Sequence, residues 1–365
     1  MVGHSELRVM WSAGIGLLAV LTTWTPANAQ TPFTVGGVTA APGTTASGEL
    51  KVAARAGDEG TIIPFSILHG TLPGPVLALV AGTHGSEYPP ILALQRLRAS
   101  IDPKTLSGTI IMVHIANMPS FLKRTVYYGP ADDKNLNRVF PGKKEGTLSE
   151  RIAETLTREV IDRATHVVDI HCGDANEWLR PYSYWVVSSA PEVVEASRQM
   201  ALAFGLDHII IDTERPANPA ESVYLVNTAL TRGKAGLTIE SGGWAQTDAP
   251  SIARIEHGIA GVLKHLRMRV EGPDPLVNAV WLGRNEVLRS KFTGLLYPAV
   301  EPGQTVPQGA LIARVTDFHG KLLQEIRSPY DGEVLYVVAT PPINAGEPVC
   351  FVAERVSNPA WRPTK

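Results

Sequence analysis

Short apolar runs alternate with amphipathic stretches along residues 48–269. The apolar runs end at glycine, proline or charged residues, which is typical of buried β-strands. The amphipathic stretches repeat their apolar residues with helical spacing. We therefore predict strands at 48–54, 61–68, 74–82, 109–116, 166–171, 208–211 and 236–240, and helices at 89–98, 149–163, 191–204, 222–232 and 249–269. This alternation predicts an α/β fold with a largely parallel sheet and helices on both faces.

The pattern changes after residue 272, where helical spacing disappears. Turn-forming residues then recur at 302–303, 307–309, 319–320, 330–332 and 344–346 and separate short stretches with strand character. We therefore predict a small all-β C-terminal domain over 273–365 after an α/β domain over 48–272.

The N-terminal residues differ from both domains. An apolar run over 10–23 follows Arg8 and precedes Ala27-Asn28-Ala29, a pattern of small residues typical of a signal-peptide cleavage site. We predict a signal peptide over 1–29, cleavage near Gln30 and export to the periplasm, with no membrane attachment afterwards. An uncleaved anchor is the alternative, but the run is short for a bilayer span. Residues 30–47 have little to bury, and we expect a flexible leader there.

Composition and charge exclude some functions. The 365 residues are 44% hydrophobic and carry a formal net charge of −2, so nothing indicates nucleic-acid binding. The chain has two cysteines, Cys172 and Cys350, in what we take to be different domains, and we do not expect them to form a disulfide.

Candidate metal ligands follow two of the predicted strands. His84 and Glu87 lie in the turn after residues 74–82, where Gly82 and Gly85 permit a tight backbone path. His171 ends another strand of the same sheet and can approach them. Asp169, two residues earlier on that strand, or Asp174 can orient an imidazole through a hydrogen bond. Two imidazoles and one carboxylate leave one position open, which is the arrangement of a catalytic zinc site. The alternative is a loop histidine beside a helix-capping glutamate.

The chain resembles the succinylglutamate desuccinylase/aspartoacylase family, which is the deacylase branch of the zinc carboxypeptidases. The resemblance lies in four ordered motifs: Gly82-Thr-His-Gly-Ser-Glu87, Asn135-Leu-Asn-Arg-Val-Phe-Pro-Gly142, Asp169-Ile-His-Cys-Gly-Asp174 and Thr238-Ile-Glu-Ser-Gly-Gly243. It implies a carboxypeptidase-like, mixed and largely parallel sheet flanked by helices. It also implies a barrel-like C-terminal domain.

The resemblance further implies that His84, Glu87 and His171 bind one zinc ion and that Glu240 is the general base. The residues agree with this role for Glu240, because it ends the predicted strand 236–240 beside two glycines. A carboxylate at that place can take a proton from a zinc-activated water. A Glu bound only to backbone amides is the alternative.

Three further residues enter through the resemblance. Asn137 and Arg138 match the family's clamp for a substrate carboxylate, and a guanidinium can grip a carboxylate through two parallel hydrogen bonds. Many members have an arginine where this chain has Val126, so we take Arg124 as the candidate that polarises the scissile carbonyl. Cys172 stands where glycine is common; we expect a small buried thiol, the alternative being a fourth metal ligand.

Together these features predict a zinc-dependent hydrolase that cleaves an amide bond in a small carboxylate-bearing substrate, an N-acyl amino acid. One alternative is a metallocarboxypeptidase that acts on short or cell-wall peptides. Another is a metal-containing binding protein that has lost catalysis, which the presence of Glu240 disfavours.

Overall fold

The computed structural model describes residues 1–3, 30–187, 189–357 and 359. The predicted signal peptide therefore lies almost entirely outside the described residues, and export stays a prediction. Among the helices of the described residues, none is long and apolar enough to cross a membrane.

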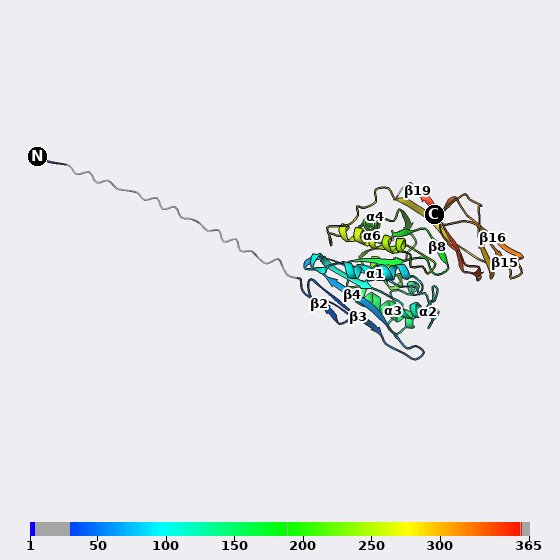
Figure 1. Cartoon of the computed structure of the whole chain (residues 1–365), viewed down its shortest axis with the longest axis horizontal. Coiled ribbons are helices and arrows are strands. Elements are labelled where there is room, and N and C mark those ends of the chain that lie inside the picture. Colours follow the sequence, from blue (N-terminus) through cyan, green and yellow to red (C-terminus); the bar gives the residue numbers. More distant parts are fainter. Residues whose placement is uncertain (4–29, 188, 358, 360–365) are drawn as a thin grey trace.

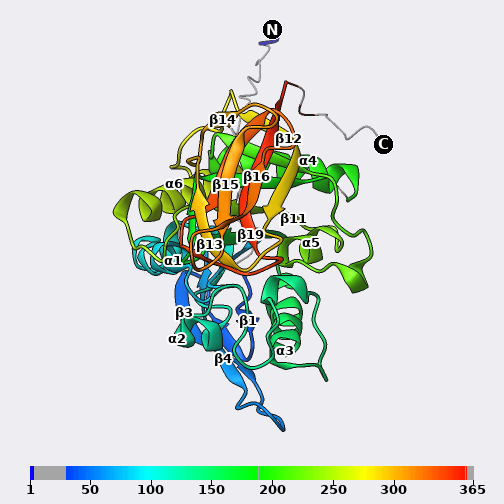
Figure 2. The same ribbon diagram turned by 90° about the vertical axis from the view of Figure 1, so that its right-hand side faces the viewer.

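One mixed sheet runs through the molecule and, in the described part of the chain, holds 13 strands (Figure 1). Its spatial order is β14 (Thr305–Val306), β17 (Gly332–Val338), β19 (Pro348–Val356), β12 (Val280–Arg289), β10 (His208–Asp212), β9 (Tyr182–Val186), β11 (Ala235–Glu240), β7 (His166–His171), β5 (Leu72–Ala81), β6 (Ser107–Val113), β4 (Thr61–His69) and β3 (Thr44–Val52), with β8 (Glu177–Leu179) paired to β17. Figure 2 shows β3 and β4 at the opposite end of the molecule from β12 and β14.

The centre of this sheet is parallel, as predicted. Strand β5 pairs in parallel with β6 and β7, and β7 pairs in parallel with β11. Strand β9 is antiparallel to β11 and parallel to β10. The strands predicted at 48–54 and 61–68 form the antiparallel pair β3–β4 at one edge.

Helices cover both faces of the sheet. They are α1 (Tyr88–Ser100), α2 (Met118–Lys123), α3 (Leu148–Leu156), α4 (Pro191–Phe204), α5 (Leu225–Leu230) and α6 (Ala249–His265), with short helical turns at Pro103–Thr105, Leu136–Arg138, Thr157–Ile161 and Pro219–Glu221. Successive residues of a strand face opposite sides. Leu77 and Leu79 of β5 accordingly pack with residues of α1, α4 and α6, whereas Ala78 and Val80 pack with residues of α3 and α5.

The C-terminal region is β-rich, as predicted, but it does not form a sheet entirely of its own. Strand β12 pairs in parallel with β10, so β12, β19 and β17 extend the main sheet. A second sheet contains β16 (Leu322–Arg327), β15 (Leu311–Thr316), β13 (Gly294–Pro298) and β18 (Pro342–Ile343). The join leaves the backbone groups of β10 paired on both sides, which removes an exposed sheet edge.

The prediction of a flexible leader over 30–47 is wrong for most of that segment. Strand β1 (Phe33–Val35) pairs with β2 (Val38–Ala40), and β3 begins at Thr44. Val35 and Ala40 are buried in the core cluster that contains Phe65. The many Thr, Gly and Ala residues give this segment no clear strand pattern, and β3 forms its hydrogen bonds with β4, which lies further along the chain.

Candidate metal centre and active site

The candidate ligands and base stand at one edge of the sheet because three parallel strands end there. His171 is the last residue of β7, and Glu240 is the last residue of β11. The two residues are direct register partners, so their side chains project from the same face. The turn with His84 and Glu87 follows the end of β5, the other parallel neighbour of β7. Ligand sites typically lie at the carboxyl ends of such strands.

Two glycines shape the turn that carries His84. Gly82 has a φ of +70°, and a Cβ at Gly85 would lie 2.3 Å from the carbonyl oxygen of Ser120. Only glycine fits both requirements without strain or displacement of the backbone. Helix α1 then begins at Tyr88 with Pro89 in its first turn, which leaves Glu87 at the position just before the helix.

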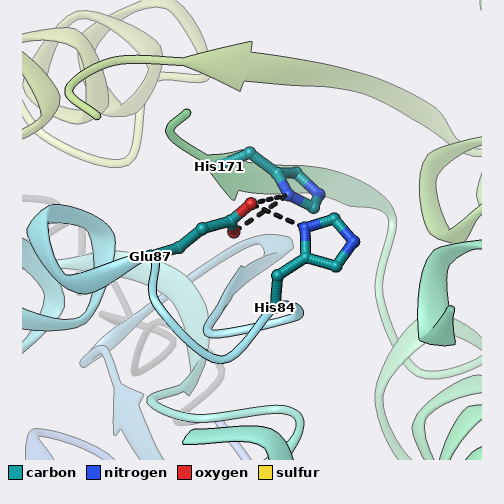
Figure 3. Close-up of side chains that lie close together, drawn as sticks. All are labelled: His84, Glu87 and His171. Atoms are coloured by element: carbon teal, nitrogen blue, oxygen red, sulfur yellow. Dashed lines mark hydrogen bonds and ion pairs between the residues drawn. The ribbon is translucent and has the colours of Figure 1, made fainter. Parts of the chain in front are cut away.

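The three predicted ligands do meet (Figure 3). Nδ1 of His84 lies 2.6 Å from Oε1 of Glu87, and Nδ1 of His171 lies 3.0 Å from Oε2 of the same carboxylate. One donor atom from each residue falls within 4.8 Å of the other two. Both imidazoles therefore present the same nitrogen, Nδ1, to one point.

The other nitrogen of each imidazole, Nε2, contacts a polar side chain. The sequence predicted one of these two side chains but not the other. Nε2 of His84 lies 3.1 Å from Oδ1 of Asn135, and Nε2 of His171 lies 3.0 Å from Oδ2 of Asp169. An oxygen at Nε2 accepts its hydrogen and leaves the Nδ1 lone pair free for a metal. Asp169 was predicted as such a partner from its place two residues before His171. Asn135 was not, because a residue distant along the chain gives no such spacing signal.

The three side chains fit a divalent cation. Oε2 of Glu87 is buried and lies 3.0 Å from Nδ1 of His171, but in the described structure it accepts no hydrogen bond of good geometry. Burial alone would lower the pKa of His84, but the carboxylates of Glu87 and Asp174 outweigh it and raise that pKa to about 9. Burial would likewise raise the pKa of Glu87, yet His171 and His84 bring it down to about 2. The site therefore places a charged carboxylate beside two imidazole nitrogens. Carboxylate oxygen and imidazole nitrogen are ligands that zinc prefers.

A cavity of about 540 Å³ opens over these residues. Glu240 lines it, together with His84, Glu87 and Cys172. Burial, with the nearby carboxylates of Glu87 and Glu177, raises the pKa of Glu240 well above the usual carboxyl range. A carboxylate with a raised pKa is a stronger base than an exposed one, so the position suits proton transfer.

The C-terminal region supplies one wall of this cavity. Val287 and Arg289 of β12, Tyr336 of β17 and Pro348 of β19 all line it. The sequence offered no signal for this contribution, because it depends on pairing between strands that are distant along the chain. The cavity is thus completed by residues that follow the predicted catalytic domain.

The two residues predicted to clamp a substrate carboxylate lie in different places. Arg138 lines the cavity, and its guanidinium carbon lies 4.7 Å from the ring centroid of Tyr224. Asn137 is buried instead, and its Nδ2 lies 3.1 Å from Nε2 of His171. Its Oδ1 accepts a hydrogen bond from the backbone of Leu225 (2.8 Å), and its Nδ2 donates one to Asp169 (3.2 Å). The structure therefore places Asn137 where it orients Asp169, and it leaves only Arg138 for a substrate.

Arg124 does not reach the cavity that the structure describes. It is exposed at the C-terminal end of α2, with a left-handed φ of 56°. Tyr127, three residues later, lines the cavity in its place. Cys172 is a buried thiol, as expected, whose pKa burial raises well above the usual thiol range. Cys172 and Cys350 are both free.

Comparison with known proteins identifies a family and a curated relative that match most of the chain. Residues 73–266 match the model of the succinylglutamate desuccinylase/aspartoacylase catalytic domain. The chain is 32% identical over 295 residues to the N-alpha-acetyl-L-2,4-diaminobutyric acid deacetylase of Halomonas elongata, an alignment that covers 78% of this chain and 84% of the relative.

Two solved structures share the fold. The product-bound ectoine utilization protein EutE (DoeB) of Ruegeria pomeroyi superposes with a TM-score of 0.76 and 26% identity, over 89% of this chain and 98% of that one. A succinylglutamate desuccinylase/aspartoacylase from Rhodobacter sphaeroides superposes with a TM-score of 0.74 and 23% identity, over 86% of this chain and 96% of that one. The C-terminal region is therefore part of the shared architecture.

Proposed function

The chain belongs to the succinylglutamate desuccinylase/aspartoacylase family, and on this basis we propose that it is a zinc-dependent deacylase of small N-acyl amino acids. The observation that carries the proposal is the convergence of His84, Glu87 and His171 on one point, in a cavity that Glu240 also lines. We also propose export to the periplasm, on the basis of the predicted signal peptide over residues 1–29.

The proposed reaction is hydrolysis of an amide bond. Zinc held by His84, Glu87 and His171 would polarise a carbonyl and make a water molecule more acidic. Glu240 takes the proton from the water as its oxygen attacks the carbonyl carbon. Glu240 then gives that proton to the amide nitrogen as the carbon–nitrogen bond breaks. The products are a carboxylic acid and an amino acid.

Arg138 is the proposed anchor for the substrate carboxylate. Its guanidinium stacks on Tyr224, and in the described part of the chain no carboxylate lies within ion-pair distance of it. Nη1 of Arg138 donates one hydrogen bond to the carbonyl oxygen of Asn137 at 2.8 Å, so the group is held in place while its other donors remain available to a carboxylate. Arg124 has no part in this proposal, because it is exposed away from the cavity.

The comparisons favour an acetyl group among the possible acyl groups. The Halomonas relative is named for deacetylating N-alpha-acetyl-L-2,4-diaminobutyric acid. A cavity of about 540 Å³ is of the size that takes a small molecule. We therefore place N-acetyl amino acids first.

A substrate panel tests this function. The zinc-loaded protein is offered N-acetyl and N-succinyl amino acids, dipeptides and short cell-wall peptides, and released acid or amine is measured. We expect turnover of acyl amino acids alone, and a higher KM with Arg138→Lys. Turnover of peptides alone would favour the carboxypeptidase. Bound zinc with no turnover of any compound would favour a binding protein.

A further inference from the structure

We propose that Arg215 and Tyr224 position the guanidinium of Arg138 and thereby set the preference of the site for a substrate with a free carboxylate. The inference rests on the proposed function, in which Arg138 binds that carboxylate. Arg138 lines the cavity, whereas Arg215 and Tyr224 do not, so they would act through Arg138.

The ring of Tyr224 is shared by two guanidinium groups. The guanidinium carbon of Arg215 lies 3.6 Å from the ring centroid, and that of Arg138 lies 4.7 Å from it. A guanidinium within about 6 Å of an aromatic centroid is attracted to the ring. Tyr224 therefore connects the two arginine side chains.

The two guanidinium groups differ in their partners. Nε of Arg215 forms an ion pair with Oδ2 of Asp212. Arg138 donates instead to a neutral group, the carbonyl oxygen of Asn137, at 2.8 Å. The carboxylate of Asp212 offsets the charge of Arg215, which reduces its repulsion of Arg138. Arg215 can thus support the ring while the charge of Arg138 remains for the substrate carboxylate.

Arg215 is itself held in place. Its side chain is 16% exposed, and that of Asp212, the last residue of β10, is 13% exposed. The carbonyl oxygen of the next residue, Pro216, accepts a hydrogen bond at 2.8 Å from Nδ2 of Asn227, a fully buried residue of α5. An arginine with these contacts differs from a solvated surface arginine, and it gives Tyr224 a rigid support.

The backbone holds Tyr224 in place through a strained residue. Val223 has a φ of 68°, a left-handed conformation that is unfavourable for a β-branched side chain. Its NH donates a hydrogen bond to the carbonyl oxygen of Phe140 at 2.8 Å. The NH of Leu225 donates one to Oδ1 of Asn137 at 2.8 Å. Both neighbours of Tyr224 are thus bonded to the segment of the proposed carboxylate anchor, and such strain is typical of ligand sites.

This arrangement pre-organises Arg138 for an anion. A free arginine side chain has many rotamers, and fixing them on binding costs affinity. Stacking on a ring that is itself fixed removes part of that cost before the substrate binds. Binding of the carboxylate should therefore weaken when the ring or its support is lost, even though Arg138 is unchanged.

The experiment compares two compounds that differ in the carboxylate alone. N-α-acetyl-L-2,4-diaminobutyrate, the compound in the name of the Halomonas relative, and its α-carboxamide are assayed with the zinc-loaded wild type, Arg215→Gln and Tyr224→Leu. We expect wild type to prefer the free carboxylate. In both variants the KM for this compound should rise about tenfold, the scale of one partly desolvated cation–π contact. Its kcat, and the kinetics of the carboxamide, should change little.

Arg198→Gln is the matched control. The guanidinium carbon of Arg198 also lies over an aromatic ring, 5.4 Å from the centroid of Trp281, and its Nη1 pairs with Glu195 at 3.3 Å. Arg198 does not line this cavity, so Arg198→Gln should keep the wild-type preference. Arg215→Lys should lose less of the preference than Arg215→Gln, because lysine keeps the positive charge.

A binding measurement separates this inference from the proposed function. Calorimetry with L-2,4-diaminobutyrate and its carboxamide requires no turnover, and circular dichroism checks the fold of each variant. Wild type should bind the free carboxylate more tightly, and Arg215→Gln and Tyr224→Leu should reduce that difference about tenfold. The inference is overturned by a wild type without the difference, by folded variants that keep it, or by variants that lose affinity for both compounds equally. A difference that depends on Arg215, in a protein that hydrolyses neither acetyl compound, would instead contradict only the deacylase proposal.

Discussion

Glu240 is the side chain through which protons move in the proposed reaction. It is the register partner of His171 and lies beside two other buried carboxylates, Glu87 and Glu177. Glu240→Gln keeps the shape of the side chain but removes its basicity. We expect turnover to fall on the order of a hundredfold or more, the usual scale of lost acid–base catalysis. Zinc content should not change, because Glu240 is not a ligand, and near-normal turnover would exclude it from the reaction.

Zinc binding should depend on pH through His84. The pKa of His84 without metal is raised to about 9, so the imidazole carries a proton at neutral pH. That of His171 is raised as well. Zinc must displace these protons, so its affinity should rise about tenfold per pH unit for each proton released as the pH increases toward 9. Calorimetry in buffers of different ionisation enthalpy measures the protons. An affinity that is constant between pH 6 and 8 would contradict this assignment.

Residue-level prediction from the sequence succeeds where a side chain is fixed by the end of a strand. His84, Glu87 and His171 were placed in this way, and they meet. Arg124 was placed wrongly, because it is exposed at the left-handed end of the short helix α2, and Tyr127 lines the cavity instead. Asn137 was expected at the substrate, but the helical turn Leu136–Arg138 directs successive side chains differently.

At the scale of elements, an ion cluster around a buried carboxylate links the C-terminal strands to the catalytic sheet. Glu333 of β17 is fully buried and lies 3.0 Å from Nε2 of His208 in β10 and 2.7 Å from Nε of Arg355 in β19. Burial would raise the pKa of Glu333, but hydrogen bonds from His208 and Arg355 lower it, so the carboxylate is charged. The cluster thus links β17 and β19 to β10 of the same sheet, with β12 lying between β19 and β10.

Removing this carboxylate should destabilise the protein. Glu333→Ala leaves Nε2 of the buried His208 without its acceptor, whereas the half-exposed Arg355 can be hydrated, and we expect the free energy of unfolding to fall by about 2 kcal/mol, as when a buried hydrogen-bond partner is lost. Glu325→Ala, which breaks an exposed pair with Arg327, is the matched control and should change stability little. Chemical denaturation measures both. Equal stabilities for the two variants would show that the buried cluster has no structural role.

Element boundaries followed from the sequence where the pattern was strong and local. The helix predicted over 191–204 is α4, with the same bounds, because Pro191 begins it and Gly205 ends it in a left-handed conformation. The strands at 33–47 were missed. Strands β1 and β2 pair with each other and pack in the core cluster of Phe65, and residues 44–47 pair with β4. The local amino-acid composition does not indicate which strands and side chains will pair with this segment.

At the scale of the whole molecule, the cavity lies between two regions that a boundary at residue 272 would separate. Strand β12 joins β10 and brings Arg289 to the cavity, and β8 joins β17 and brings Tyr336 there. Such long-range pairing cannot be inferred from turn signals and periodicity. The catalytic unit in our account is therefore the α/β region together with the C-terminal strands.

The central claim is that His84, Glu87 and His171 together hold one zinc ion. The most direct test is elemental analysis of the purified protein beside His84→Ala and His171→Ala. We expect one zinc per chain in the wild type and loss of zinc in both variants, with their folds retained by circular dichroism. Wild-type zinc content in either folded variant, or no metal uptake by the wild type, would contradict the account.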